Sequence, residues 1–214
     1  MTAGRGIMHS EIPRPNADGS PNVGLQLWVD LPKHLKLCEP RYRDLQAPEI
    51  PHVDIDNNLV HVEVISGVSH GVESVKELAY TPVWFLDIKI KPGGKITQEL
   101  PVGWNAFAYV LSGTVTFDVG GEKQVVKQYH NVVFEQEGNS VAAEVEASAK
   151  ENAHLGMKIP ANPFFKYPTK VHKFMLIPPL VVIAGQPLDQ PVARYGPFVM
   201  VGLFLYKPYF IGRS

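Results

Sequence analysis

The residues best suited to holding a metal ion lie near the start of the chain, in the stretch Met8-His9-Ser10-Glu11. On a β-strand, residues two apart point to the same face, so the His9 imidazole and the Glu11 carboxylate converge on one spot. Sets of two histidines and one carboxylate suit non-haem iron, because they leave coordination positions open for oxygen or substrate. His9 and Glu11 are therefore candidate iron ligands. By spacing alone, the alternative is the end of a surface strand that carries two polar residues.

Other chemistry-bearing residues form less specific patterns. The glycines of residues 2–6, TAGRG, match neither a P-loop nor a dinucleotide-binding motif, but they permit a sharp bend or a close approach of the backbone to a neighbouring element. Cys38 is the single cysteine, which excludes an internal disulfide and a thiolate-cluster metal site. No Gly-x-Ser-x-Gly motif points to a hydrolase. His130 is typical of a solvated turn residue, and the pair His61-x-Glu63 is typical of a strand surface.

The composition is that of an ordinary globular protein, and 214 residues can bury one large core or two small ones. The net charge is -1 and the pI is about 6.7, so no global positive field draws the chain onto nucleic acid. Residues 1–15 contain no apolar stretch of signal-peptide length, and no apolar run reaches the ~18 residues of a membrane span. We expect a soluble intracellular protein.

Short β-strands are the expected secondary structure, because 19 prolines and 18 glycines leave little room for long helices. Alternating apolar residues predict strands over residues 25–30, 61–65 and 84–90. Two further strands, 107–111 and 114–119, flank a tight Ser112-Gly113 turn, and Gly120-Gly121 supplies the next hairpin before a strand over 122–127. This pattern favours an all-β antiparallel sandwich or barrel.

Three stretches lack strand alternation. Residues 31–52 suit a connector that contains a helical turn at most. Residues 157–180 string prolines between aromatic residues and look inserted. Residues 201–214 form an apolar tail to which the sequence assigns no role.

Six blocks of the chain resemble consecutive blocks of the pirin family: MTAGRGIMHSEIP, GLQLWVDLP, EPRYRDLQAPEIP, ISGVSHGV, GWNAFAYVLSG and IAGQPLDQPVARYGPFVM. The resemblance covers most of residues 1–200 and implies two cupin-type antiparallel β-barrels, or jelly rolls. Residues 1–53 would be the remnant of an N-terminal cupin with its connector. Residues 54–200 would be the C-terminal cupin, interrupted by the insert, with an atypical tail after it.

The resemblance also implies a ligand set for iron in the N-terminal barrel, made of three histidines and one glutamate. Two of these histidines come from a His-Pro-His-Arg-Gly type strand, which this sequence does not contain, and His9 and Glu11 match the other pair. We therefore expect iron to be weakly bound or absent. A replacement ligand would have to come from His34, His52 or the insert. Metal-binding cupins place a His-x-His after the first glycine turn, where this chain has Gly94-Lys-Ile-Thr-Gln98, so the second barrel is expected to be metal-free.

Two functions follow from the resemblance. The first is a pirin-like iron-binding cupin of the nucleus and cytoplasm that acts as a transcriptional co-regulator, binding a transcription factor or another protein but neither nucleic acid nor a membrane directly. The second is a metal-dependent quercetin-type 2,3-dioxygenase that acts on a flavonoid, with little or no activity expected here. A third interpretation is a non-functional product of an altered transcript or gene model. The truncated first barrel should expose Leu25, Leu27 and Val29 and leave the protein marginally stable.

Overall fold

β-strands make up nearly all of the regular structure, which confirms the all-β class. The computed structural model describes residues 1–10, 12–20, 22, 24–75, 80–149, 179–191, 193–195 and 198–200. Two 3₁₀ turns, η1 (Lys33–Leu35) and η2 (Ala47–Glu49), precede the strands. None of the helices in this part of the chain is long and apolar enough to cross a membrane.

The strands follow in chain order: β1 (His52–Ile55), β2 (Val60–Ser66), β3 (Val68–Ser69), β4 (Val72–Glu73), β5 (Val83–Ile90), β6 (Lys95–Glu99), β7 (Asn105–Val110), β8 (Thr114–Val119), β9 (Glu122–Lys127), β10 (Asn131–Phe134), β11 (Ser140–Glu144), β12 (Pro179–Gly185), β13 (Ala193–Tyr195) and β14 (Phe198–Met200). They belong to two compact units. The first unit comprises Met1–Asp44, Glu77–Pro82 and Leu188–Ser214, and the second comprises Leu45–Lys76 and Val83–Pro187.

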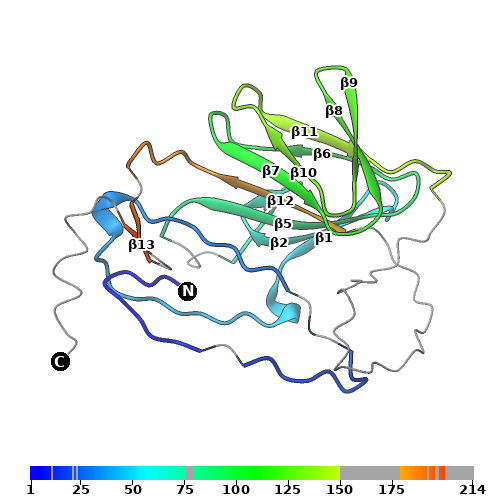
Figure 1. Ribbon diagram of the computed structural model, residues 1–214. Helices are drawn as coiled ribbons and strands as arrows, with labels where there is room; N and C mark the ends of the chain where they lie inside the picture. The colour runs from blue at the N-terminus through cyan, green and yellow to red at the C-terminus, as the bar shows by residue number, and fades with distance from the viewer. Residues whose placement is uncertain are drawn as a thin grey trace, which may run out of the picture. The chain divides into compact units, whose positions relative to one another are not determined.

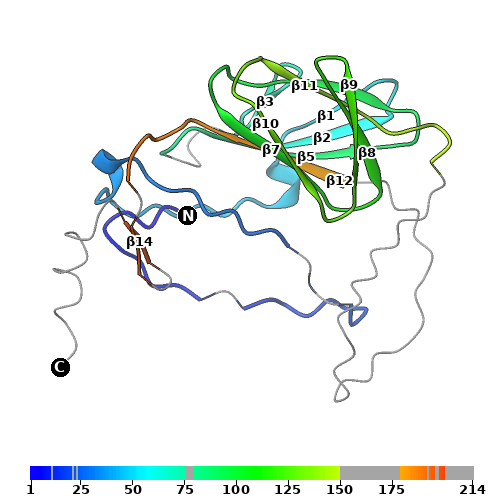
Figure 2. The same ribbon diagram turned by 45° about the horizontal axis from the view of Figure 1, so that its top comes forward.

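The second unit is a barrel of two antiparallel sheets (Figures 1 and 2). One sheet has the order β1-β2-β5-β12-β7-β10, and the other has the order β6-β11-β8-β9. Alternation along the strands sends one set of side chains inward: Val60, Val62 and Val64 of β2 are fully buried. Side chains of both sheets, among them Leu86, Ile88, Val115, Phe117 and Val141, form one continuous apolar core.

Strand β12 lies between β5 and β7 (Figure 1), and it pairs with β5 over residues 179–185 and with β7 over residues 180–185. Leu180 and Val182 point into the core and are almost fully buried. The predicted insert, residues 157–180, lies outside the described residues except for its last two, which begin this strand. The tail, residues 201–214, lies outside them as well.

The predicted strands over residues 61–65 and 84–90 are confirmed as the central parts of β2 and β5. The hairpin at Gly120-Gly121 is also confirmed, because both glycines have positive φ (62° and 92°), as a tight turn between paired strands requires. Residues 31–52 form a connector with two single helical turns, and β1 begins at its last residue, His52.

The predicted hairpin at Ser112-Gly113 is wrong. Strand β7 pairs with β12 and β10, whereas β8 pairs with β9 and β11, so the chain passes from one sheet to the other at this bend. Ser112 is buried at the corner, and Gly113 has a φ of 72°. A Ser-Gly bend fits both a hairpin and a corner between two sheets. Which of the two forms depends on whether the flanking strands pair with each other or pack their apolar faces together from opposite sheets.

The predicted strand over residues 25–30 is also wrong, since residues 24–30 are all described and none is in a strand. Alternation marks a strand only where a partner strand supplies hydrogen bonds. The expected exposure of the apolar side chains is confirmed for Leu25 and Val29, which are 49% and 43% exposed, while Leu27 is half-buried.

The packing of the barrel gives a first test. Leu86 is fully buried at the centre of the core, so we expect Leu86→Ala to lower the free energy of unfolding by about 2–5 kcal/mol. Urea unfolding followed by tryptophan fluorescence measures the change. Val133, on β10, is 72% exposed, and Val133→Ala serves as the control, with a loss below about 1 kcal/mol. Equal losses in the two variants would contradict the packing described.

Candidate functional site

The predicted iron pair is only half described. His9 is exposed, and residues 7–10 are not in a strand, so the expectation that this stretch forms a strand is wrong for the described residues. A β-strand would direct the side chains of residues 9 and 11 to the same side, but residues 7–10 do not form one. Glu11 itself lies outside the described residues.

The segment just before this pair is held by its backbone. Thr2 and Arg41 exchange two backbone hydrogen bonds of 2.7 and 2.9 Å, and the Arg5 amide donates to the Cys38 carbonyl oxygen at 3.0 Å. At Gly4, where φ is 51°, an added Cβ would lie 2.1 Å from that same carbonyl oxygen. The TAGRG backbone thus makes one of the two arrangements that its glycines permit, a close approach to a neighbouring segment.

Replacement ligands are not gathered around an ion in the described part of the chain. Within it, no three or more histidine, cysteine, aspartate or glutamate side chains are placed to hold a metal ion. His34 is exposed on η1, and His52 is exposed on β1, where its ring centroid is 5.2 Å from that of His61. The insert lies outside the described residues. The described residues therefore do not fit the four-ligand iron set that the family resemblance implies.

The buried side chain of Gln98, in the second unit, is fully engaged in hydrogen bonds with neighbouring residues. Gln98 ends the Gly94–Gln98 stretch in which the resemblance would place the His-x-His of a metal-binding cupin, and its side chain is 3% exposed. Its amide nitrogen donates to the carbonyl oxygens of Val68 (3.1 Å) and Glu99 (2.7 Å). Its amide oxygen accepts from the Ser69 hydroxyl at 2.8 Å. These hydrogen bonds engage both ends of the amide, as burial of a polar side chain requires.

Titratable side chains gather instead on the outer face of β1, β2 and β5. The strand register places Asp54 opposite His61 and His61 opposite Lys89. His61 Nδ1 lies 2.8 Å from Asp54 Oδ1, and Lys89 Nζ lies 3.2 Å from Glu63 Oε1. His61 and Glu63 were expected on a strand surface, but their clustering with charged residues of β1 and β5 was not predicted. The available signal was a second alternating charged pair, Asp87-x-Lys89, on a strand that could lie beside the first.

Asp87 is the most deeply placed carboxyl of this cluster. Its Oδ1 atom is buried and has no hydrogen-bond partner among the described residues. Burial is the main reason that its pKa is raised above the ordinary value; Lys89 opposes this shift, and Glu63, directly across the strand pair, adds to it. Ionised Asp87 therefore costs the folded state free energy at neutral pH.

The sign of this effect can be tested with Asp87→Asn. Because the pKa is higher in the folded state, the unfolded chain releases the proton first as pH rises, and stability falls until the folded carboxyl also ionises. The variant should therefore be more stable than wild type at pH 7, and its urea midpoint should be higher. Near pH 4 the difference should shrink.

A matched control is Glu122→Gln on the exposed edge of β9, for which we expect no such pH-dependent gain. Lower stability of Asp87→Asn at pH 7 would instead mean that the charged form of Asp87 stabilises the barrel.

Comparison with known proteins identifies this barrel. The family model for the pirin C-terminal cupin domain matches residues 85–155. The chain is 38% identical over 200 residues to pirin of Homo sapiens, covering 94% of this chain and 57% of that protein. It is 34% identical to a pirin-like protein of Solanum lycopersicum, covering 100% of this chain and 63% of that one. The chain thus spans less than two thirds of the length of these relatives.

Solved structures show the same fold. A quercetin 2,3-dioxygenase of Acinetobacter baumannii superposes with a TM-score of 0.65 at 23% identity, over 85% of this chain and 52% of that one. The GK1651 protein of Geobacillus kaustophilus superposes with a TM-score of 0.57, also at 23% identity, over 77% of this chain and 54% of that one. At this identity, the likeness shows the fold and no activity. The description of the fold as a cupin rests on the family model.

Proposed function

This chain belongs to the pirin family, and from that membership we propose that it is a protein-binding cupin, a transcriptional co-regulator of the pirin type with an impaired iron site. The observation that carries the proposal is that packed side chains fill the interior of the barrel. Apolar side chains from both sheets fill it, and its buried amide, Gln98, is committed to neighbouring groups. Such an interior supports a structural or binding role for the second unit.

The impaired site follows from the number of donors. His9 and Glu11 are the two matches to the family's ligand set, and two ligands plus water hold an ion less firmly than four fixed ones. The described residues bring no third donor to a common point. We therefore expect iron, where it binds at all, to exchange readily with the solvent.

Exposed aromatic side chains support a protein partner. Trp28 and Tyr42, both in the first unit, are 68% and 69% exposed. Large aromatic side chains are enriched at protein interfaces, where they bury much area for little loss of conformational entropy. Trp28 lies just before the charged connector and Tyr42 lies within it. These side chains are the contacts that we propose for a transcription factor or another protein.

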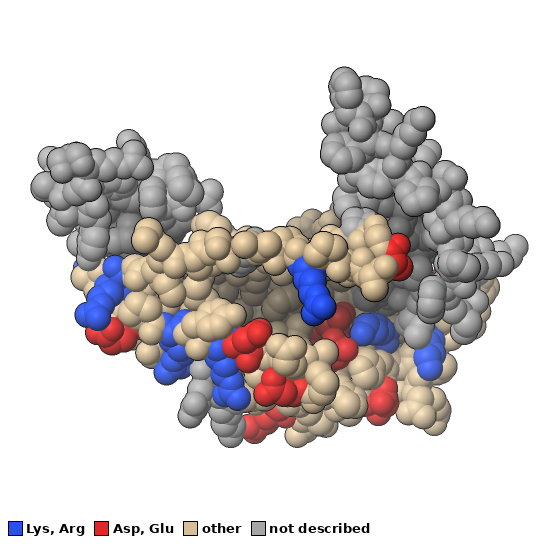
Figure 3. Space-filling model, turned by 90° about the horizontal axis from the view of Figure 1, so that it is seen from below, with Lys and Arg blue, Asp and Glu red and all other residues tan. Residues whose placement is uncertain are grey.

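Charge argues against direct contact with nucleic acid. On the described part of the face in Figure 3, basic and acidic side chains are interspersed rather than gathered into a field of one sign. The chain as a whole has a net charge of -1. Binding along a phosphate backbone requires a basic stripe. We therefore propose that the protein, present in the nucleus and the cytoplasm, affects transcription through contacts with other proteins.

The alternative function is a metal-dependent quercetin-type 2,3-dioxygenase that accepts a flavonoid. The cupin architecture shared with the Acinetobacter baumannii enzyme favours it. This alternative needs further metal ligands, which would have to come from residues outside the described part of the chain or from another protein.

Iron binding separates the two functions. The full chain, purified and loaded with Fe²⁺ under anaerobic conditions, should retain well below one iron per chain after desalting and should not consume quercetin. His9→Ala should abolish the residual iron, whereas His130→Ala, on an exposed turn, should leave it unchanged. One tightly held iron per chain that disappears in His9→Ala, together with quercetin cleavage, would establish the dioxygenase instead.

A further inference from the structure

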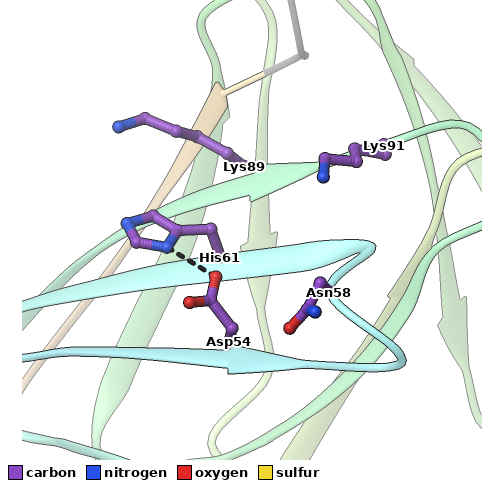
Figure 4. A pocket seen from close by; sticks show the side chains of 5 residues that line it. All are labelled: Asp54, Asn58, His61, Lys89 and Lys91. Atoms are coloured by element: carbon purple, nitrogen blue, oxygen red, sulfur yellow. Dashed lines mark hydrogen bonds and ion pairs between the residues drawn. The ribbon is translucent and has the colours of Figure 1, made fainter.

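A small pocket lies on the barrel where the turn between β1 and β2 meets the end of β5 (Figure 4). It has a volume of about 370 Å³ and is lined by Asp54, Asn58, His61, Lys89 and Lys91. Figure 4 shows Lys91 and Asn58 on the right and Lys89 and His61 on the left, with Asp54 between the two sides. All five residues belong to the second unit, so the pocket is complete within the barrel.

The wall that carries Asn58 has an uncommon backbone. Asp56, Asn57 and Asn58 have φ values of 51°, 55° and 62°, so three consecutive non-glycine residues are left-handed. Two contacts fix this turn. The Asp56 carboxylate accepts from the Lys95 amide at 2.8 Å, and the Leu59 carbonyl oxygen accepts from the Lys91 amide at 2.8 Å. The backbone of the turn is therefore anchored to the β5–β6 connection, and this backbone places Asn58 at the pocket.

Two hydrogen-bond donors of the pocket have no partner among the described residues. The Asp54 carboxylate is engaged by His61 Nδ1 at 2.8 Å, and Lys89 is paired with Glu63 at 3.2 Å. By contrast, the Lys91 ammonium and the Asn58 side-chain amide have no hydrogen-bond or ion-pair partner among the residues that the structure describes. With histidine counted as neutral, the lining side chains carry two positive charges, on Lys89 and Lys91, and one negative charge, on Asp54. The net charge of the lining is therefore positive, although Glu63 lies beside Lys89.

We propose that this pocket binds a phosphate group, with the Lys91 ammonium and the Asn58 amide as direct donors and Lys89 adding positive charge. A phosphate group presents a concentrated negative charge and several acceptor oxygens, which match convergent donors. It can come from free phosphate or from a small phosphorylated molecule. The volume of about 370 Å³ lies in the range of small-molecule sites and leaves room beyond the phosphate itself, which favours the ester.

Titration of the ¹⁵N-labelled full chain tests the site. Inorganic phosphate and glycerol 1-phosphate are added separately at constant ionic strength, balanced with sodium chloride. We expect saturable shifts of the Asn58 and Lys91 amide signals with both ligands. Tighter binding of the ester would identify a phosphorylated molecule as the source, and equal binding would identify free phosphate; either result supports a phosphate site.

Two variants test the assigned donors. Lys91→Gln should weaken binding about tenfold, the loss expected when one charge-assisted hydrogen bond is removed. Asn58→Gly preserves the left-handed backbone while removing the amide, so it should weaken binding several-fold with an unchanged circular dichroism spectrum. Lys123→Gln, which removes the same charge from the other sheet, should change affinity less than twofold. Shifts that grow linearly without saturation, or equal affinities in the Lys91 and Lys123 variants, would overturn the proposal.

Discussion

The pairing of β12 with both β5 and β7 is the interaction on which the rest of the barrel depends. Without this strand, the six-stranded sheet separates into β1-β2-β5 on one side and β7-β10 on the other. Leu180 and Val182 would leave the core with it. Residues 145–178 separate β12 from the preceding strand, β11, in the sequence. The sheet is therefore completed by a pairing that is distant along the chain and must offset the entropy of loop closure.

The same strand geometry that builds the core also builds the outer surface. Since alternate residues point to opposite faces, burying Val60, Val62 and Val64 of β2 obliges His61 and Glu63 to face outward. The register then sets these two side chains beside Lys89 and Asp87 of β5. The register of the strands therefore determines both the core and the charged surface. A one-residue shift in register would place charges in the core and would disperse both the charged cluster and the pocket.

Local signals in the sequence predicted local structure well. The alternation in residues 61–65 and 84–90 and the two glycines at 120–121 specify strands and a hairpin without reference to the rest of the chain. The Ser112-Gly113 bend was misassigned because a turn sequence does not reveal whether the next strand pairs with the last one or joins the opposite sheet. The charged cluster was missed because it arises from register between strands, which one sequence does not show. His9 and Glu11 came from resemblance to a family, and the strand expected to align them is not formed over the described residues 7–10.

Amide hydrogen exchange of β12 tests most directly whether this strand closes the barrel. If it does, the amides of residues 180–185 that pair with β5 and β7 should exchange only through the global unfolding of the barrel, with the same opening free energy as the central amides of β5. Exchange of β12 at least about a hundredfold faster than that of β5, equivalent to roughly 2.7 kcal/mol of easier opening, would show that the barrel persists without it and would contradict this closure.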